Sequence, residues 1–417
     1  MARRPIRAAD GPVIELASSA EVIAVLGDYS AANPPWLPAA HPFPQGSLPP
    51  RFDFNGISQR QLTELIAVRG PLHCSDGWSY LSKAISALFL GDRHAARHLA
   101  YYAELRASLS ILASQGIGIF NSINCVIDDA GNRHDLENRG THDMCWLALD
   151  HWAKTPGSFE KIASAINING ANLFEALSAY FPGSSGTTLG HGLIKGWGVD
   201  LSAATDDHIA RNYSSYTPND LSPMSSRPAL DLDFIRSLWR SFQPSAFGLE
   251  RHLLRLILET ELANTGGAAL SPLGYANLDP RIAAHVSEGF LSRTEEVDEH
   301  PIIRAADTTD TSAEAMLARG AILLRIATSL AQDNLGKAGV GINELEPWWS
   351  TLGLERGLWS HPAEPTDMSE LWMEVEDALE AASQAEQTSR HGWLGELPGS
   401  TLRLFQTERI ALWNLCA

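Results

Sequence analysis

The residues best suited to chemistry lie in a short stretch, IARNYSSYTP, at residues 209–218. Arg211 carries a guanidinium, whose paired donors suit phosphate or carboxylate oxygens, and Asn212 follows it directly. His208 lies three residues before Arg211, so the two side chains share one face of a helix. The stretch therefore places an anion-binding group beside a side chain that can transfer protons near neutral pH.

The net charge of the chain limits what this arginine can bind. The 417 residues carry a formal net charge of -18, which excludes a generally basic, non-specific nucleic-acid binder. The acidity is uneven, because residues 341–386 hold eleven acidic residues and one basic residue, Arg356. A local phosphate contact at Arg211 is therefore physically allowed.

A purely structural role is the alternative for the same stretch. Arg211 could pair with Asp206 or Asp207, which precede it on the same helix. Tyr216 could pack its ring and hydrogen-bond its hydroxyl just before Pro218 ends the helix.

The strongest helical pattern covers residues 93–114. Large apolar residues recur there at intervals of three and four, and a second stripe of small residues runs beside them. Small side chains let another helix approach closely, so we expect this helix to be central. The small residues are Ala96, Ala100, Ala103 and Ala107.

A different pattern follows this helix. Isoleucines and Cys125 fall on odd positions between 117 and 127, and the turn-forming residues DDAGN follow at 128–132. This alternation predicts a short β-hairpin set among helices. Further helices are expected at 143–154, 158–180, 231–241, 248–264, 312–332, 367–385 and 401–415.

Two of these segments together resemble the HEPN superfamily of helical toxin and phage-defence ribonucleases. The first is AARHLAYYAELRASLSILASQGIGI, at 95–119, and the second is the run from Arg211 to Tyr216, with the resemblance covering residues 77–218. In active members an arginine steadies the scissile phosphate while a histidine moves protons, so that the ribose 2′-hydroxyl can attack without a metal ion. The resemblance implies a helical bundle, RNA as substrate and no cofactor. It also implies a homodimer, since active members commonly join two motifs across a symmetric interface.

The chain departs from the family pattern at one position. Tyr216 stands where the family has its histidine, and a phenol with a pKa of about 10 is a poor base at neutral pH. Two histidines could replace it: His208, on the same helix face as Arg211, and His98, on the predicted helix at 93–114.

Other groupings suggest different chemistry. The glycine-rich loop 183–198 could hold a nucleotide, although no strand precedes it and no Gly-Lys-Ser/Thr follows. His73, Cys74, His142 and Cys145 could bind zinc or be ordinary buried residues. Basic residues at 93–106 could bind phosphate or pair internally.

The acidic stretch at 341–386 suggests a protein interface. Trp348, Trp349, Trp359 and Trp372 lie within it, and aromatic anchors among carboxylates suit a partner with a basic surface. The same tryptophans could equally belong to the core.

These patterns predict a mainly α-helical protein in three parts. Residues 1–55 form an extended proline-rich arm, residues 56–225 a HEPN-like helical domain, and residues 226–417 a second helical domain with an acidic C-terminal part. Scattered cysteines and the lack of a long apolar segment favour a cytoplasmic protein without membrane spans.

The functional expectation is an endoribonuclease of a toxin or phage-defence system. Arg211 would bind phosphate, Asn212 would orient it, and His208, His98 or Tyr216 would serve as the acid–base group. The alternative is an inactive helical scaffold that binds a protein partner through its acidic, tryptophan-bearing part.

Overall fold

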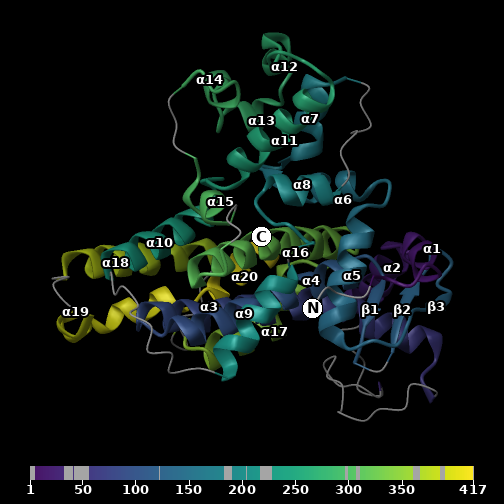
Figure 1. Ribbon diagram of the computed structural model, residues 1–417, viewed down its shortest axis with the longest axis horizontal. Coiled ribbons are helices and arrows are strands. Elements are labelled where there is room, and N and C mark those ends of the chain that lie inside the picture. Colours follow the sequence, from purple (N-terminus) through teal and green to yellow (C-terminus); the bar gives the residue numbers. More distant parts are fainter. Residues whose placement is uncertain are drawn as a thin grey trace.

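The computed structural model describes residues 5–31, 41, 56–121, 123–182, 190–202, 204–216, 228–295, 299–306, 310–359, 367–385 and 390–416. The protein is mainly helical, as predicted, and helices form every layer of it (Figure 1). Of the arm predicted at 1–55, residues 5–31 are described, and they are helical rather than extended, because they form two helices whose apolar side chains are buried. The proline-rich part at 34–50 lies outside the described residues except for residue 41, and so do residues 183–189 and 217–227.

Three long helices form the centre of the molecule. Each begins at a side chain that caps its first turn: Ser58, Asp92 and Ser312 accept hydrogen bonds from backbone N–H groups three residues further on. The three pack along one another more extensively than any other elements. They are α3 (Gln59–Phe89), α4 (Arg93–Ser114) and α16 (Ala313–Lys337).

The small-residue stripe of α4 is buried, as predicted from its spacing. All four alanines are fully inaccessible to solvent. A Cβ built at Gly77 of α3 would lie 2.5 Å from Leu324 of α16 and 3.5 Å from the carbonyl oxygen of Ala103. Gly320 of α16 is as close to α4, because a Cβ there would lie 3.7 Å from the Cβ of Ala103. Small residues on all three helices therefore set their separation.

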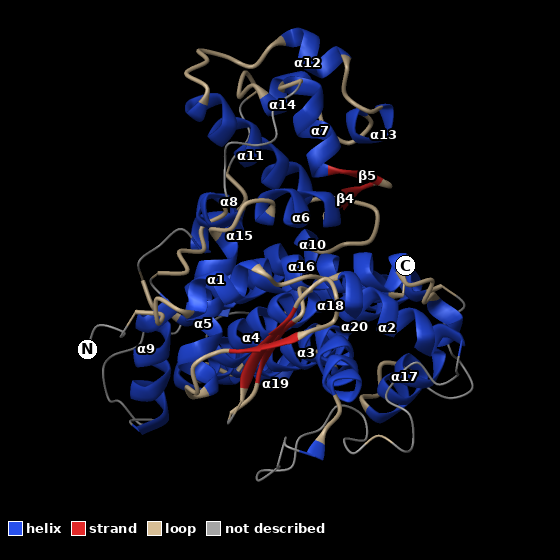
Figure 2. Cartoon of the chain, turned by 90° about the vertical axis from the view of Figure 1, so that its right-hand side faces the viewer, coloured by secondary structure: helices blue, strands red, loops and turns tan. Residues whose placement is uncertain are grey.

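A three-stranded antiparallel sheet lies beside this core (Figure 2). The predicted hairpin is present and is extended by a third strand, which pairs Val126 with His134. Gly116 has a φ of 81°, and a Cβ there would lie 2.4 Å from a backbone oxygen, so only glycine fits between helix and sheet. The strands are β1 (Ile117–Ile119), β2 (Asn124–Ile127) and β3 (Arg133–Asp135), and α1 (Asp10–Glu15), α2 (Ala20–Ala31) and α5 (Thr141–Ala153) lie nearby.

The expected helix at 158–180 is wrong as a continuous element. Asn169 and Gly170 both have positive φ, as a tight two-residue hairpin turn requires. A short two-stranded antiparallel hairpin therefore interrupts the expected helix at this point. The result is α6 (Ser158–Ala165), β4 (Asn167–Ile168), β5 (Ala171–Asn172) and α7 (Leu173–Tyr180).

A group of short helices stands on one side of the long ones (Figure 1). α6 contacts α16. α11 contacts α7 and α8, which precede the predicted boundary at 225, and α14, which follows it. The group comprises α6, α7, α8 (Gly190–Gly196), α11 (Glu250–Asn264), α12 (Pro272–Ala276), α13 (Pro280–Ala283) and α14 (Glu288–Leu291).

The C-terminal elements complete the core. α16 and α20 pack on α3, so helices from both sides of the predicted boundary at 225 share one hydrophobic cluster. These elements are α10 (Pro228–Ser241), α15 (Pro301–Ala306), α17 (Ile342–Glu355), α18 (Leu371–Gln384), α19 (Arg390–Glu396), α20 (Glu408–Leu415) and the 3₁₀ turns η3 (Met368–Glu370) and η4 (Gly399–Phe405).

A buried charge cluster attaches one further helix, α9 (Ala204–Tyr216), to this core. Arg319 of α16 donates from Nε and Nη2 to the two carboxylate oxygens of Asp207, at 3.0 and 2.6 Å. Glu104 of α4 lies 3.8 Å from the same guanidinium, and burial together with the charge of Asp207 raises the pKa of Glu104 well above its usual value. Since Asp207 takes the paired donors, Glu104 is the member that stays protonated.

We expect Ala103→Leu to destabilise the protein by about 3 kcal/mol, because the added atoms have no room between α3, α4 and α16. Chemical denaturation would measure the loss, with the exposed Ala263→Leu on α11 as a control that changes stability little. A variant as stable as the unmodified protein would contradict the close packing of these helices.

Replacing Glu104 with Gln should change how stability depends on pH. The pKa of this carboxyl rises on folding, so its contribution to the stability of the folded state decreases as pH increases above the unfolded-state pKa of 4.5. Between pH 5 and 8 the free energy of unfolding of the unmodified protein should therefore fall relative to Glu104→Gln, by about 1.4 kcal/mol for each unit of elevation. Urea denaturation at several pH values tests this, and parallel curves would show that Glu104 is ionised.

Candidate functional site

The two segments that suggested a phosphate-cleaving site lie against each other. α9 packs along α4, and Arg211 donates from Nη2 to the hydroxyl oxygen of Tyr102 and from Nη1 to the Asn212 side-chain oxygen at 2.7 Å. The guanidinium carbon also lies 5.1 Å from the centre of the Tyr102 ring. Within the described residues no carboxylate pairs with Arg211, and Asp207 pairs with Arg319 instead. Of the structural alternative, the ion pair of Arg211 with Asp206 or Asp207 is absent among the described contacts, and Arg211 is held by Tyr102 and Asn212 instead.

His98 also contacts the Tyr102 ring, with ring centres 5.2 Å apart and the rings tilted by 58°. Its Nδ1 is 2.7 Å from the hydroxyl oxygen of Ser215, and that hydroxyl donates to the backbone oxygen of Arg211 at 2.9 Å. Because a hydroxyl has one hydrogen, Ser215 can only accept from His98. His98 therefore carries its proton on Nδ1 and keeps the lone pair of Nε2.

The charge state of His98 follows from its surroundings. Partial burial lowers the pKa of His98, and the positive charge of Arg211 lowers it further. The imidazole is thus neutral at pH 7, which is the form that accepts a proton.

His208 belongs to a second aromatic group behind Tyr102. Its ring lies nearly parallel to those of His142 and Tyr101, with centres 5.3 and 5.4 Å away. Trp146 donates to the Tyr101 hydroxyl at 3.4 Å, which leaves the phenol hydrogen for Nδ1 of His142 at 3.0 Å. This network holds the wall of the site in place.

Tyr216 lies away from these groups. Its side chain is 84% exposed at the last residue of α9. The structure thus brings Arg211, Asn212, His98 and His208 to one region of α4 and α9, and it leaves Tyr216 at the surface.

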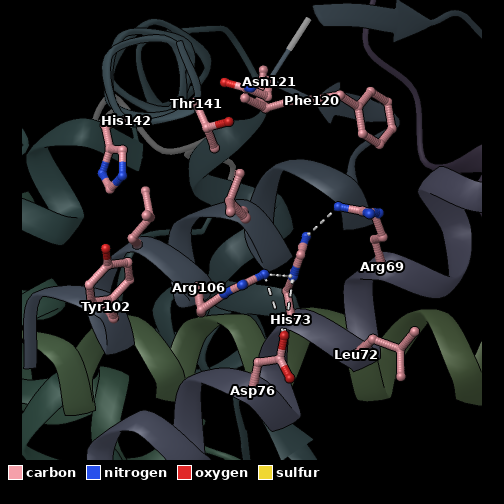
Figure 3. Close-up of a pocket in the computed structure, with 13 residues that line it drawn as sticks. Arg69, Leu72, His73, Asp76, Tyr102, Arg106, Phe120, Asn121, Thr141 and His142 are labelled. Atoms are coloured by element: carbon pink, nitrogen blue, oxygen red, sulfur yellow. Dashed lines mark hydrogen bonds and ion pairs between the residues drawn. The ribbon is translucent and has the colours of Figure 1, made fainter. Parts of the chain in front are cut away.

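A pocket of about 580 Å³ opens on the other face of Tyr102 and His142 (Figure 3). Four charged or titratable side chains meet at its wall. Arg69 and Arg106 approach opposite nitrogens of the His73 ring, at 3.3 and 2.9 Å, and Arg106 lies 3.4 Å from Asp76. Burial lowers the pKa of His73 to about 4, so the ring between the two guanidiniums is neutral.

The other candidate groupings are dispersed. The Cys74 thiol forms a hydrogen bond with the Thr328 hydroxyl at 3.1 Å, and Cys145 is buried. In the described part of the chain, no group of side chains has the ligands for a metal ion. Trp349, Trp359 and Trp372 are buried, so they do not stand at the surface as interface anchors. Of the helices in the described ranges, none has the length and apolar run that a membrane crossing needs.

Comparisons of the chain with family models, with curated proteins and with solved structures found no match. The resemblance to HEPN proteins stays a prediction, and the function is inferred from the geometry of the site.

The sequence pattern did not indicate several residues of the site and of the pocket. It did not single out Arg69 or Asp76, and Ser215 stood out only as part of the motif from Arg211 to Tyr216. A signal was present for Arg69, His73 and Asp76, because their spacing of four and three puts them on one face of a helix.

We expect His73 to contribute to the acid lability of the protein. Its pKa is lowered on folding, so its contribution to stability is fully present above pH 6.5 and is lost as pH falls towards 4. At 1.4 kcal/mol per unit, the unmodified protein should lose about 3 kcal/mol relative to His73→Gln between pH 7 and 4. Denaturant titrations give this difference, and a constant difference across the range would mean that His73 is charged in the folded state.

Proposed function

We propose that the protein is a metal-independent endoribonuclease whose active site lies between α4 and α9. The observation that supports this is the joint placement of Arg211 and His98 around Tyr102, with Ser215 fixing the tautomer of His98. This arrangement offers a cationic donor and a neutral base in the same place, which are the two groups that RNA transesterification needs.

The proposed reaction begins at a ribose 2′-hydroxyl. Nε2 of His98 takes its proton as the 2′-oxygen attacks phosphorus, and Arg211 stabilises the negative charge that develops on the phosphoryl oxygens. The bond from phosphorus to the 5′-oxygen breaks, and that oxygen leaves as a hydroxyl after taking a proton from solvent. The products are a 2′,3′-cyclic phosphate and a 5′-hydroxyl end.

The remaining residues have supporting roles in this proposal. Asn212 accepts from Arg211 and so orients the guanidinium, while His208 packs behind the site. The proposed base is therefore His98 and not Tyr216, whose ring is exposed to solvent and makes none of the described contacts with Arg211 or His98. In a cell, such an activity suits a toxin or a phage-defence effector, because unselective RNA cleavage stops growth.

The test is incubation of purified protein with total RNA and with a fluorescent oligoribonucleotide. Arg211→Ala and His98→Ala should each lower the cleavage rate by about a hundredfold or more, since each removes a group that acts in the transition state. Ser215→Ala should lower it by about tenfold, because His98 loses its tautomer preference. Tyr216→Phe is the matched control on α9 and should cleave like the unmodified protein.

The pH profile and the ends of the products give independent checks. The cleavage rate should rise with pH and reach half of its maximum below pH 6.5. The reason is that the pKa of His98 is lowered and its neutral form acts as the base. If Arg211→Ala and His98→Ala cleave at the unmodified rate, or if 3′-hydroxyl ends form, the assigned mechanism is wrong.

A further inference from the structure

The pocket beside Tyr102 has features that the proposed cleavage does not use. It lies between α3, α4, the end of β1 and the start of α5, and its volume is within the range that holds a small ligand. Its charged residues, Arg69, Asp76 and Arg106, converge on His73 in Figure 3. Tyr102 lines the pocket and also contacts Arg211 and His98.

Donor groups outnumber acceptor groups in the described contacts of His73. A neutral imidazole has one N–H and one lone pair, and guanidiniums only donate. Arg106 and Arg69 approach both nitrogens of His73, so in either tautomer one guanidinium faces an N–H group. Asp76 lies 3.8 Å from Nδ1 of the same ring and 3.4 Å from Arg106, so its carboxylate meets part of this donor capacity.

The charges are also unequal. Two guanidiniums lie at the wall, whereas Asp76, the one carboxylate among the described residues that line it, has half of its side chain exposed to solvent. Burial lowers the pKa of Arg69 to about 10, with a further contribution from the charge of Arg106. An anion in the pocket beside these arginines would offset both their mutual repulsion and the cost of burying Arg69.

The N-terminal end of α5 adds to the positive electrostatic potential in the pocket. α5 begins at Thr141, which lines the pocket together with His142, and the preceding Gly140 has no side chain that could cap the first turn. The N-terminal end of a helix attracts negative charge. The acidic residue of this turn, Asp143, is exposed and does not line the pocket.

We propose that this pocket binds the phosphate group of a nucleotide or of RNA. Paired guanidiniums and a helix start match the several oxygens of a phosphate, and the volume accommodates the attached nucleoside. The inference goes beyond RNA cleavage, since binding here requires neither Arg211 nor His98. The phosphate comes either from a free nucleotide or from a strand that continues past Tyr102, and the experiment distinguishes these sources.

The experiment measures binding by calorimetry at low salt with three probes: inorganic phosphate, AMP and a 5′-phosphorylated deoxyribonucleotide trimer, which resists cleavage. Citrate serves as a carboxylate probe. Arg69→Gln should weaken phosphate binding by about tenfold or more, because it removes one charge from a partly desolvated site. Asn121→Asp should weaken it by about threefold, since it adds a negative charge at an exposed position of the pocket rim.

Two matched controls complete the design. Arg281→Gln changes a surface arginine on α13 and should leave binding unchanged, and Arg211→Ala should bind the probes normally while losing cleavage. If AMP binds more tightly than the trimer, the site is assigned to free nucleotides. Tighter binding of the trimer, with displacement of AMP, assigns it to the nucleic-acid strand.

Three results would overturn the proposal. The first is the absence of binding by every phosphate probe at millimolar concentration. The second is binding that neither Arg69→Gln nor Asn121→Asp weakens. The third is equal binding of citrate, which would mark a general anion site. If Arg69→Gln does not fold, Asn121→Asp decides the question, because its side chain is exposed and outside the buried cluster.

Discussion

The paired hydrogen bonds between Arg319 and Asp207 fix the position of α9, and the candidate side chains that α9 carries, Arg211, Asn212 and His208, depend on them. Asp207 directly precedes His208 and lies one helical turn before Arg211, so its attachment to α16 sets the rotation of α9 about its axis. α16 can deliver this arginine because glycine and alanine side chains let it approach α4 closely. A packing constraint in the core thus determines where Arg211 meets Tyr102.

α4 serves the core and the site with different faces. Its alanines are buried against α3 and α16, while His98, Tyr102 and Arg106 recur at intervals of four along another face. These three residues successively contact Ser215, Arg211 and His73. One helix therefore holds the proposed base, the shared Tyr102 and one arginine of the pocket in fixed order, which is the kind of rigid support that a preorganised site requires.

The sequence predicted what depends on local pattern. The alanine stripe predicted a central helix, and alternation at 117–127 predicted the hairpin, because both periodicities report which face is buried. It did not predict the tertiary partners: Asp207 and Arg319 lie more than a hundred residues apart, so nothing local distinguishes their pairing from an Asp207–Arg211 pair. The turn at Asn169 and Gly170 was missed although an Asn-Gly pair is a strong turn signal, since the flanking residues also fit a helical pattern. Pockets depend on several elements at once, and the spacing of Arg69, His73 and Asp76 indicates only a shared helix face.

The two neighbouring sites interact through Tyr102. Its hydroxyl accepts from Arg211, its ring centre lies 5.2 Å from that of His98, and the same residue lines the pocket, so Tyr102 is common to both proposed sites. A negative charge in the pocket would stabilise the protonated form of His98, opposing the effect of Arg211 on its pKa. It would also offset part of the positive charge of Arg69 and Arg106. A phosphate bound as proposed would therefore make His98 a stronger base in the proposed cleavage, and this effect would act through the charge of the phosphate rather than through Arg211.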